Sequence, residues 1–347
     1  MRLPFSVSLA LLISLSSNPI VGASETASKS SPRTIQTEFV CKASIPAGPA
    51  GAKKVSLWIP VPSNSEWQQI ENVTVEGVPD YKITTEPRYK NRMAYVSLDA
   101  PQTPVSVTVK YTVTRKEVKV LAEEAKHPKK ESDAFLKMNL QAEKSLPTGG
   151  RFQKISDEVT AGETTRLKKA HAIYEHILKT MKYDYKSVSP KLGEGDAEFM
   201  CDYKSGDCTD LHSYFISLAR TQGIPVLHEY GFGIGGVPLP SPLPTEAKIT
   251  SYHCYACIYE PDYGWIPVDA SDGIRWVDHE RSDLREYQFG NLVLERNAVS
   301  ISRGRNLVLA PPQKGEPVNK FIYPYAEVDG KPTKVELDLT RRLIKLP

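Results

Sequence analysis

Cysteine, histidine and aspartate occur in that order along the chain, in settings that suit nucleophilic chemistry. Cys208 directly follows Asp207, a residue type that commonly caps helices, and precedes an apolar pattern of helical spacing. A thiol in the first turn of a helix lies at the positive end of the helix dipole, which favours the thiolate over the thiol. Downstream, His253 and Asp269 each lie in or next to a segment of β-forming residues. The three residue types predict a thiol nucleophile, its base and a carboxylate that orients the base.

The first element that must position these side chains is a helix predicted over residues 208–222. Apolar residues recur along it at helical spacing, so we expect an amphipathic helix with one buried face. Gly223 is expected to end this helix as a glycine C-cap. Pro225 follows two residues later, as prolines commonly do after a helix. The negative charges of Asp207 and Asp210 oppose a thiolate, so the imidazolium of His253 would have to supply the larger effect on the pKa of Cys208.

Two strands, predicted over residues 252–259 and 265–270, would bring the histidine and the aspartate together. Paired as a hairpin, they would let Asp269 face His253 across the ladder and hold the far nitrogen of the imidazole. The nearest alternative carboxylate is Asp272, which lies past the strand among turn-forming residues. Asp269 could also be a turn residue with no role in chemistry.

Four more side chains are candidates for the oxyanion site or the cleft walls, beside the backbone N–H of Cys208, which is suitably placed for an oxyanion. The second donor stays open, with the Tyr203 hydroxyl as one candidate and a packing role as its alternative. His212, one turn after the cysteine, is expected to pack against the sulfur or orient it. Tyr255 and Trp265 are expected to form walls of the cleft rather than to take part in the reaction.

A metal site is the rival interpretation of the cysteines, because Cys254 and Cys257 have the spacing of a metal-binding pair. On a regular strand these two side chains point to opposite faces, whereas a zinc knuckle needs a tight turn. A structural zinc would also need two more ligands, for which the candidates are Cys201, Cys208 and His212. We therefore expect neither a metal nor another cofactor.

Length and composition indicate an ordinary globular protein with room for two domains. The chain has 347 residues, of which 40% are hydrophobic and 24% are charged, and its formal net charge is +3. No basic run interleaved with aromatic residues stands out, so nucleic acid is not expected as a partner.

The first residues predict a cleavable signal peptide over 1–23. Arg2 supplies a positive end, residues 5–17 are apolar, and Val21-Gly22-Ala23 offers a small-residue cleavage site. The apolar run is shorter than the roughly 20 residues that cross a bilayer, and no later segment is long enough, so no transmembrane segment is expected in the mature chain. The sequence thus predicts a secreted or periplasmic protein cleaved near Ala23, with an uncleaved membrane anchor as the alternative.

Five cysteines imply at least one free thiol if the chain works in an oxidising compartment. If Cys208 is the free one, up to two disulfides can form among Cys41, Cys201, Cys254 and Cys257. Spacing does not determine how they connect. A bond between Cys201 and Cys254 is a guess, made because both flank the proposed site.

The order of the patterns predicts an α+β protein. We expect a disordered leader over 24–36, a β-rich domain like a small sandwich over 37–120, a charged connector over 121–150, and a domain over 151–347 in which helices precede an antiparallel sheet.

In these motifs the chain resembles the transglutaminase-like superfamily, in particular its secreted bacterial members. Three separated motifs occur in the order found there: Gly206-Asp207-Cys208-Thr209-Asp210 with Arg220 and Gly223-Ile224-Pro225, then His253-Cys254-Tyr255, then Gly264-Trp265 through Asp269. Residues 289–292 and 323–327 also look like this group, so the resemblance runs from about Thr164 to the C-terminus. Tyr255 stands where a tryptophan is common and Cys257 where a glutamate is frequent, and no counterpart of the animal calcium sites is recognisable.

The resemblance implies a papain-like α+β core, with the cysteine on a central helix packed against an antiparallel sheet. It also implies acyl transfer through a thioester on a protein or peptide substrate, with Cys208 similar to the nucleophile, His253 to the base and Asp269 to the orienting acid. A cysteine peptidase or amidase, which transfers the acyl group to water, is favoured over an acyltransferase that passes it to an amine. The alternative is an inactive member that serves as a binding or cell-surface module.

Overall fold

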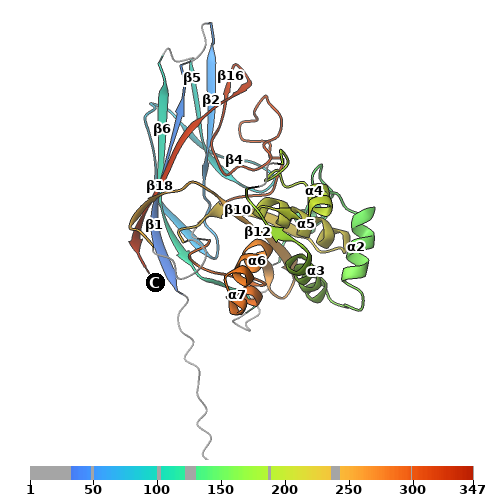
Figure 1. Ribbon diagram of the computed structural model, residues 1–347. Coiled ribbons are helices and arrows are strands. Elements are labelled where there is room, and N and C mark those ends of the chain that lie inside the picture. The colour runs from blue at the N-terminus through green and yellow to red at the C-terminus, as the bar shows by residue number, and fades with distance from the viewer. Residues whose placement is uncertain are drawn as a thin grey trace, which may run out of the picture. The chain divides into compact units, whose positions relative to one another are not determined.

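Alternating β-segments from both halves of the chain build two five-stranded antiparallel sheets (Figure 1). The computed structural model describes residues 33–47, 51–99, 103–121, 130–186, 189–235, 243–297 and 299–346. The predicted signal peptide over 1–23 lies outside these residues. β1 already begins at Thr34, inside the range that was expected to form a disordered leader.

The strand orders of the two sheets mix early and late segments of the chain. The first sheet runs β11 (Glu246–Lys248), β18 (Glu336–Lys345), β1 (Thr34–Ile45), β6 (Val105–Lys116) and β3 (Gln68–Glu76). The second sheet runs β17 (Lys331–Thr333), β16 (Tyr325–Val328), β2 (Lys54–Val61), β5 (Arg92–Asp99) and β4 (Lys82–Thr85).

The inward-facing residues of the two sheets form one apolar core. Phe39 and Ala43 of β1 and Leu57 and Ile59 of β2 are buried in the same cluster, as alternation along a strand requires when one face is covered. The predicted sandwich is therefore present, and late strands complete it, because β18 pairs with β1 and β16 pairs with β2. The domain boundaries expected from the sequence stay a prediction.

A third antiparallel sheet carries the helical part of the molecule. Its order is β13 (Gly264–Val268), β12 (His253–Glu260), β10 (Val226–Phe232) and β15 (Val299–Arg303). The helices are α1 (Asp133–Met138), α2 (Arg151–Val159), α3 (Arg166–Thr180), α4 (Ala197–Tyr203), α5 (Cys208–Thr221), α6 (Ala270–Asp278) and α7 (Ser282–Tyr287). Two short pairs complete the fold, β7 (Val118–Lys119) with β14 (Asn291–Leu292) and β8 (Lys182–Tyr183) with β9 (Ser205–Gly206). The predicted α+β class is confirmed.

Helix α5 lies at the centre of this part, and the expectation that it is amphipathic is wrong. Every residue from Cys208 to Arg220 is buried, because β10 and β12 cover one side of the helix while α2, α3, α4 and α6 cover the others. Several of its polar side chains find partners inside the protein. Arg220, for example, donates to the carbonyls of Gln141 and Val226 and pairs with Glu143. Oγ of Ser217 and Nε of Arg220, in contrast, are buried without a hydrogen-bond partner among the described residues.

Both ends of α5 are fixed by local hydrogen bonds that the sequence signals. Asp207 is the N-cap and forms a capping box with Asp210. At the other end Gly223, with φ of +73°, donates to the carbonyl of Arg220, and Ile224 donates to the carbonyl of Ala219. This pair of bonds is a Schellman motif, which satisfies carbonyls that the helix leaves free.

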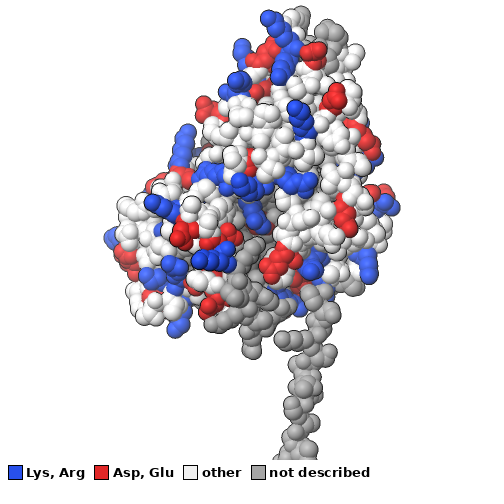
Figure 2. Space-filling view, turned by 180° about the vertical axis from the view of Figure 1, so that it is seen from behind, with Lys and Arg blue, Asp and Glu red and all other residues white. Residues whose placement is uncertain are grey.

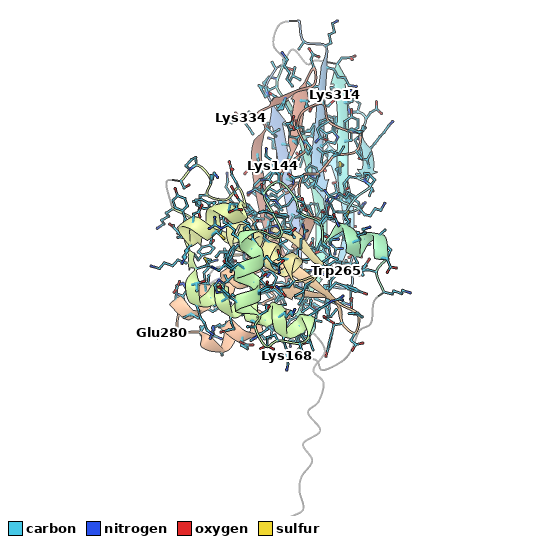
Figure 3. All side chains as sticks on the ribbon, turned by 90° about the vertical axis from the view of Figure 1, so that its right-hand side faces the viewer. Lys144, Lys168, Trp265, Glu280, Lys314 and Lys334 are labelled. Carbon is cyan, nitrogen blue, oxygen red and sulfur yellow. The ribbon has the colours of Figure 1, made fainter. Side chains whose placement is uncertain are left out.

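The surface shows two distinct parts of the molecule. Lys314 and Lys334 lie on the tall β part, whereas Lys168 and Glu280 lie on the helical part (Figure 3). On the face shown in Figure 2, acidic and basic side chains are interspersed, and several Lys and Arg side chains gather beside a hollow between the parts. Among the helices of the described residues, none is long and apolar enough to cross a membrane.

Replacing Leu339 by alanine should destabilise the protein by about 2–4 kcal/mol, since this β18 side chain is buried in the sandwich core. Leu337 lies on the same strand but is 37% exposed, so Leu337→Ala should change stability by no more than about 0.5 kcal/mol. Urea denaturation of both variants checks this. Equal, small losses would mean that the late strand does not complete the sandwich.

Candidate active site

Cys208 lies in the first turn of α5, where the capping box holds the backbone in place. The Asp207 carboxylate accepts from the N–H of Thr209 at 2.7 Å, and the Asp210 carboxylate accepts from the N–H of Asp207 at 3.1 Å. The two bonds lock the turn that presents the thiol. Cys208 is 4% exposed, and its sulfur lies at the positive end of the helix dipole.

His253 and Asp269 meet through a turn rather than across the strand ladder. The hairpin predicted between β12 and β13 is present, with Ala256 paired to Val268, so Asp269 is in register with Tyr255 and not with the histidine. β13 ends at Val268, and Asp269 is the N-cap of α6. Its Oδ2 lies 2.6 Å from Nε2 of His253 while its Oδ1 accepts from the backbone N–H of Asp272.

The same carboxylate therefore does both things that the sequence offered as alternatives. It caps a helix with one oxygen and holds the far nitrogen of the imidazole with the other, and it is fully buried. The backbone bond fixes the position of the carboxylate, which in turn fixes the orientation of the ring.

The environment of Cys208 favours its thiolate. A hydrogen bond from Cys254 has the largest effect and lowers the pKa of the Cys208 thiol, burial raises it, and a hydrogen bond from His253 lowers it again. The net pKa is about 6, against an ordinary value of 9.0. Because Nε2 of the imidazole is taken by Asp269, Nδ1 is the ring nitrogen left to serve the sulfur, and Nη2 of Arg296 lies 3.5 Å from it.

The environment of His253 favours its imidazolium. Burial opposes the charge, but the carboxylates of Asp269 and Asp272 outweigh it and raise the pKa of His253 to about 10. Asp272 Oδ2 lies 3.8 Å from Nε2, and Arg296 holds that carboxylate with contacts of 2.8 and 3.1 Å. Asp272, the rival carboxylate in the sequence, thus forms ion pairs with Arg275 and Arg296 and lies farther from Nε2 than Asp269 does.

The other cysteines are free thiols, so the guessed bond between Cys201 and Cys254 is wrong. All five cysteines of the chain are buried and none is in a disulfide. Cys254 lies instead against the first turn of α5, with its sulfur 3.8 Å from Thr209 Oγ1 and 3.7 Å from His212 Nδ1. Burial raises the pKa of Cys254 well above its usual value, so this thiol stays protonated and can donate to Cys208.

His212 lies behind the site, and the sulfur that it contacts is that of Cys254. Its Nε2 accepts the backbone N–H of Ala270 at 3.1 Å, and its Nδ1 faces the Cys254 sulfur. Burial lowers the pKa of His212 to about 4, so the ring is neutral. It links the start of α6, and hence Asp269, to the thiol that contacts Cys208.

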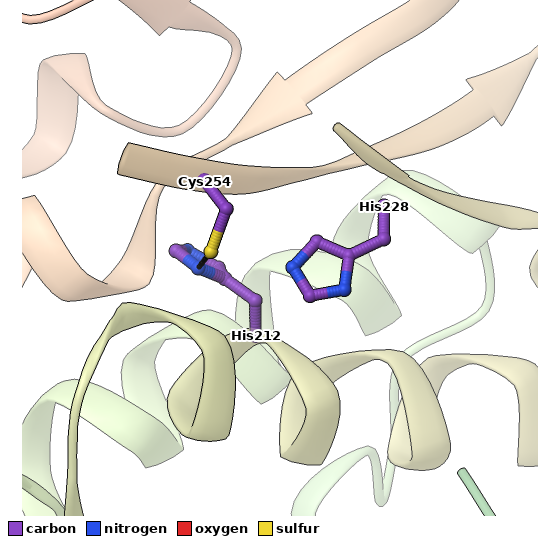
Figure 4. Close-up of side chains that lie close together, drawn as sticks. All are labelled: His212, His228 and Cys254. Atoms are coloured by element: carbon purple, nitrogen blue, oxygen red, sulfur yellow. Dashed lines mark hydrogen bonds between the residues drawn. The ribbon is translucent and has the colours of Figure 1, made fainter. Parts of the chain in front are cut away.

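One cluster of metal-ligating atoms lies next to the site (Figure 4). His212, His228 and Cys254 are fully buried, and their ligand atoms lie within 4.8 Å of one another. The donor set fits a structural zinc poorly, since it offers three ligands where such a site takes four. A ligating imidazole also normally donates its second N–H outward, whereas Nε2 of His212 is occupied as an acceptor by Ala270. Cys257 does not join the cluster and lines a separate cavity.

A cleft of about 710 Å³ opens in front of Cys208 and His253. Lys248, Thr250 and Ser251 line it and are exposed, so water has access to the cleft. Deeper lining residues are mainly aromatic or basic and include Tyr183, Tyr252, Arg275, Arg296, Tyr323 and Arg341.

Three of the expected cleft residues lie elsewhere. Tyr203 is 66% exposed, stacks on Phe199 and does not line the cleft. Tyr255 donates to Glu229 and Trp265 donates to Glu131, and both line a separate cavity of about 70 Å³ (Figure 3 labels Trp265). Alternation explains Tyr255, because it points to the sheet face opposite Cys254.

Sequence reasoning missed three residues that shape the site. Arg296 lines the cleft from the segment between β14 and β15 and Tyr183 from the two-residue strand β8, and both segments are too short to show a periodic pattern. The sequence does offer a signal for Cys254, because it directly follows His253 at the start of β12. Both residues are therefore placed where the N-terminus of α5 can contact them. The contact of Cys254 with Cys208 depends on packing between elements, which a local pattern does not report.

Comparisons with known proteins agree with this fold. Residues 153–270 match the profile of the transglutaminase-like superfamily. A protein of Haemophilus influenzae described as uncharacterized is 30% identical over 315 residues, covering 83% of this chain and 84% of that protein.

Two solved structures are similar to the chain. One, from Cytophaga hutchinsonii and described as a candidate cysteine protease, aligns over 92% of this chain and 93% of its own, with a TM-score of 0.55 and 16% identity. That likeness concerns the fold alone. The periplasmic domain of TgpA from Pseudomonas aeruginosa aligns over 74% of this chain and 93% of its own, with 14% identity; its TM-score of 0.38 is too low to bear on the fold.

Iodoacetamide should alkylate Cys208 faster than any other cysteine at pH 7, because its pKa of about 6 leaves it mostly thiolate while burial raises the pKa of Cys41 to about 12. The rate should rise through pH 6 and then level off. Peptide mass mapping across pH measures it, and Cys208→Ala should remove the fast phase. Slow, equal labelling of all thiols would contradict the assignment.

Proposed function

Because the chain belongs to the transglutaminase-like superfamily, we propose that it is a thiol-dependent enzyme that acts on amide or peptide bonds. The observation that carries the proposal is the chain of contacts from the Cys208 sulfur through His253 to Asp269, with Nε2 and Oδ2 2.6 Å apart. The opposite shifts of the two pKa values, down for the thiol and up for the imidazole, support a thiolate–imidazolium pair at rest.

In the first step the Cys208 thiolate attacks the carbonyl carbon of the substrate amide and forms a C–S bond. The carbonyl π electrons move to oxygen and give a tetrahedral oxyanion. When the C–N bond breaks, His253 gives its Nδ1 proton to the leaving amine, and a thioester remains on the cysteine. Asp269 holds the ring and balances its charge throughout.

The oxyanion needs donors aimed at the developing charge. The backbone N–H of Cys208, in the first turn of α5, is our first candidate. For the second we favour Tyr183 over Tyr203, because it lines the cleft. Burial and the nearby Cys208 charge raise the pKa of Tyr183, so its hydroxyl keeps the proton that it would donate.

In the second step an acceptor attacks the thioester, and His253 takes the acceptor's proton as the thiolate leaves. Water gives a carboxylic acid, whereas a primary amine gives a new amide. We favour water, because the exposed residues at the rim of the cleft leave the site open to solvent. The substrate we infer is a protein or peptide.

We also propose that this reaction takes place outside the cytoplasm. The support is the signal-peptide pattern over residues 1–23. Recovery of a periplasmic or secreted form whose mass corresponds to a start near Ser24 would verify the proposal, and an uncleaved cytoplasmic form would refute it.

The proposed activity is tested with randomised peptide pools, incubated with and without a primary amine. The wild-type protein should release new carboxyl ends, and Cys208→Ala should lower the rate by about a thousandfold or more because no other group supplies the nucleophile. Mass spectrometry distinguishes acids from amine adducts. Unchanged turnover by Cys208→Ala would reject the thiol mechanism, whereas a well-folded wild type without turnover would favour the binding-module alternative.

The pH profile of kcat/KM should be bell-shaped, rising as Cys208 ionises near pH 6 and falling as His253 loses its proton near pH 10. Asp269→Asn removes the negative charge that raises the imidazole pKa, so the alkaline limb should move to lower pH. With a lower pKa, the imidazole of His253 stabilises the Cys208 thiolate less, so the pKa of the thiol should rise. The acid limb should then move to higher pH, and the bell should become narrower. Asparagine can still cap α6, which keeps the comparison fair.

A further inference from the structure

The cleft in front of Cys208 is lined by more cations than anions. Lys248, Arg275, Arg296 and Arg341 contribute positive charges, while Asp207 is the carboxylate among its lining residues in the described part of the chain. Asp207 is engaged as the cap of α5, where it accepts two backbone N–H groups. The lining therefore favours a ligand that carries negative charge.

Three of the four cations already have carboxylate partners. Arg275 and Arg296 both contact Asp272, at 3.3 and 2.8 Å. Lys248 lies 3.3 Å from Asp338, in a pair whose members are both more than half exposed, so water screens it. Asp272 is shared by the two arginines, so a net positive charge remains at these three positions, but each of the three cations has a carboxylate in contact.

Arg341 differs from the other three. It is 4% exposed, and its guanidinium donates to the carbonyls of Pro244 at 2.8 Å and Ile234 at 3.1 Å. Among the described residues, no carboxylate lies within ion-pair distance of it. Carbonyl groups accept hydrogen bonds but carry no net charge, so the positive charge of this arginine is buried and not neutralised.

An uncompensated guanidinium in a cleft is suited to bind a carboxylate. Arginine stays protonated in proteins and has five N–H donors, of which the two carbonyls take two. The remaining donors form the planar fork that matches a carboxylate. Burial lowers the pKa of Arg341, as expected for a charge that would gain from an anionic partner.

We propose that Arg341 is a specificity residue that binds a carboxylate of the substrate, so that the cleft selects acidic peptides over neutral ones. The inference rests on the proposed function, since it names the substrate class for the cleft that contains Cys208. The carboxylate can come from an acidic side chain or from a free C-terminus, and both present the same group to the arginine. Arg341 acts on binding, and the chemical step stays with Cys208, His253 and Asp269.

The test measures binding without turnover, in a Cys208→Ala background. Three pools of randomised hexapeptides are compared: one with a single Glu and an amidated C-terminus, one with Gln at the same place and an amidated C-terminus, and one with Gln and a free C-terminal carboxylate. The Glu pool, the free-carboxylate pool or both should bind roughly tenfold to a hundredfold more tightly than the neutral pool. Which of the two pools gains identifies the source of the carboxylate.

Arg341→Gln should remove this preference and leave binding of the neutral pool within about twofold, because only the charged contact is lost. Arg342→Gln is the matched control. Its residue is adjacent on β18, pairs with Glu38 and does not line the cleft, so it should keep the preference. Arg341→Lys retains the charge without the fork and should keep part of it, which preserves the test if Arg341→Gln does not fold.

Equal binding of all three pools would overturn the inference, and so would a preference that survives Arg341→Gln or disappears in Arg342→Gln. These results do not depend on catalysis. Turnover of neutral peptides that requires Cys208, together with no preference for acids, would leave the proposed function standing while this inference fails. If the protein binds acidic peptides through Arg341 but shows no turnover, this inference stands while the proposed function fails.

Discussion

The buried contact between His253 and Asp269 is the constraint on which the rest of the site depends. A buried imidazolium is costly unless a carboxylate neutralises it, and here the two atoms lie 2.6 Å apart with Asp269 fully buried. The carboxylate is itself tied to the start of α6 through the N–H of Asp272. Helix capping and imidazole orientation thus share one side chain, so the cap that fixes the carboxylate also fixes the position of the oxygen that holds the ring.

The second constraint is the position of the sulfur. Helix α5 is buried on all sides, and its first turn is locked by Asp207 and Asp210, so the thiol of Cys208 has little freedom to move away from the imidazole. Cys254 and His212 fill the space behind it and connect it to the start of α6. The low pKa of the thiol therefore depends on packing between three elements, not on the helix dipole alone.

Local signals in the sequence predicted local structure well. The cap at Asp207, the stop at Gly223 and the β12–β13 hairpin each depend on neighbours within a few residues, and all are present. Signals that depend on distant packing failed. The polar residues of α5 suggested an exposed face, but Arg220 finds its partners inside the protein.

The same limit explains the other differences. Tyr203 lies close to Cys208 in sequence, yet it is the last residue of α4 and is exposed at the surface. Arg296, in contrast, contacts the imidazole of His253 although it lies 43 residues later in the chain. The return of β18 to pair with β1 is also invisible locally, because strand alternation reports one covered face without saying what covers it.

The most direct test of the account is the thiolate titration of Cys208, followed by ultraviolet absorbance as the difference between wild type and Cys208→Ser. We predict a transition near pH 6 that moves to higher pH in His253→Ala, since that variant loses both the hydrogen bond and the charge that favour the thiolate. A transition near the ordinary cysteine pKa of 9.0, unchanged in His253→Ala, would contradict it.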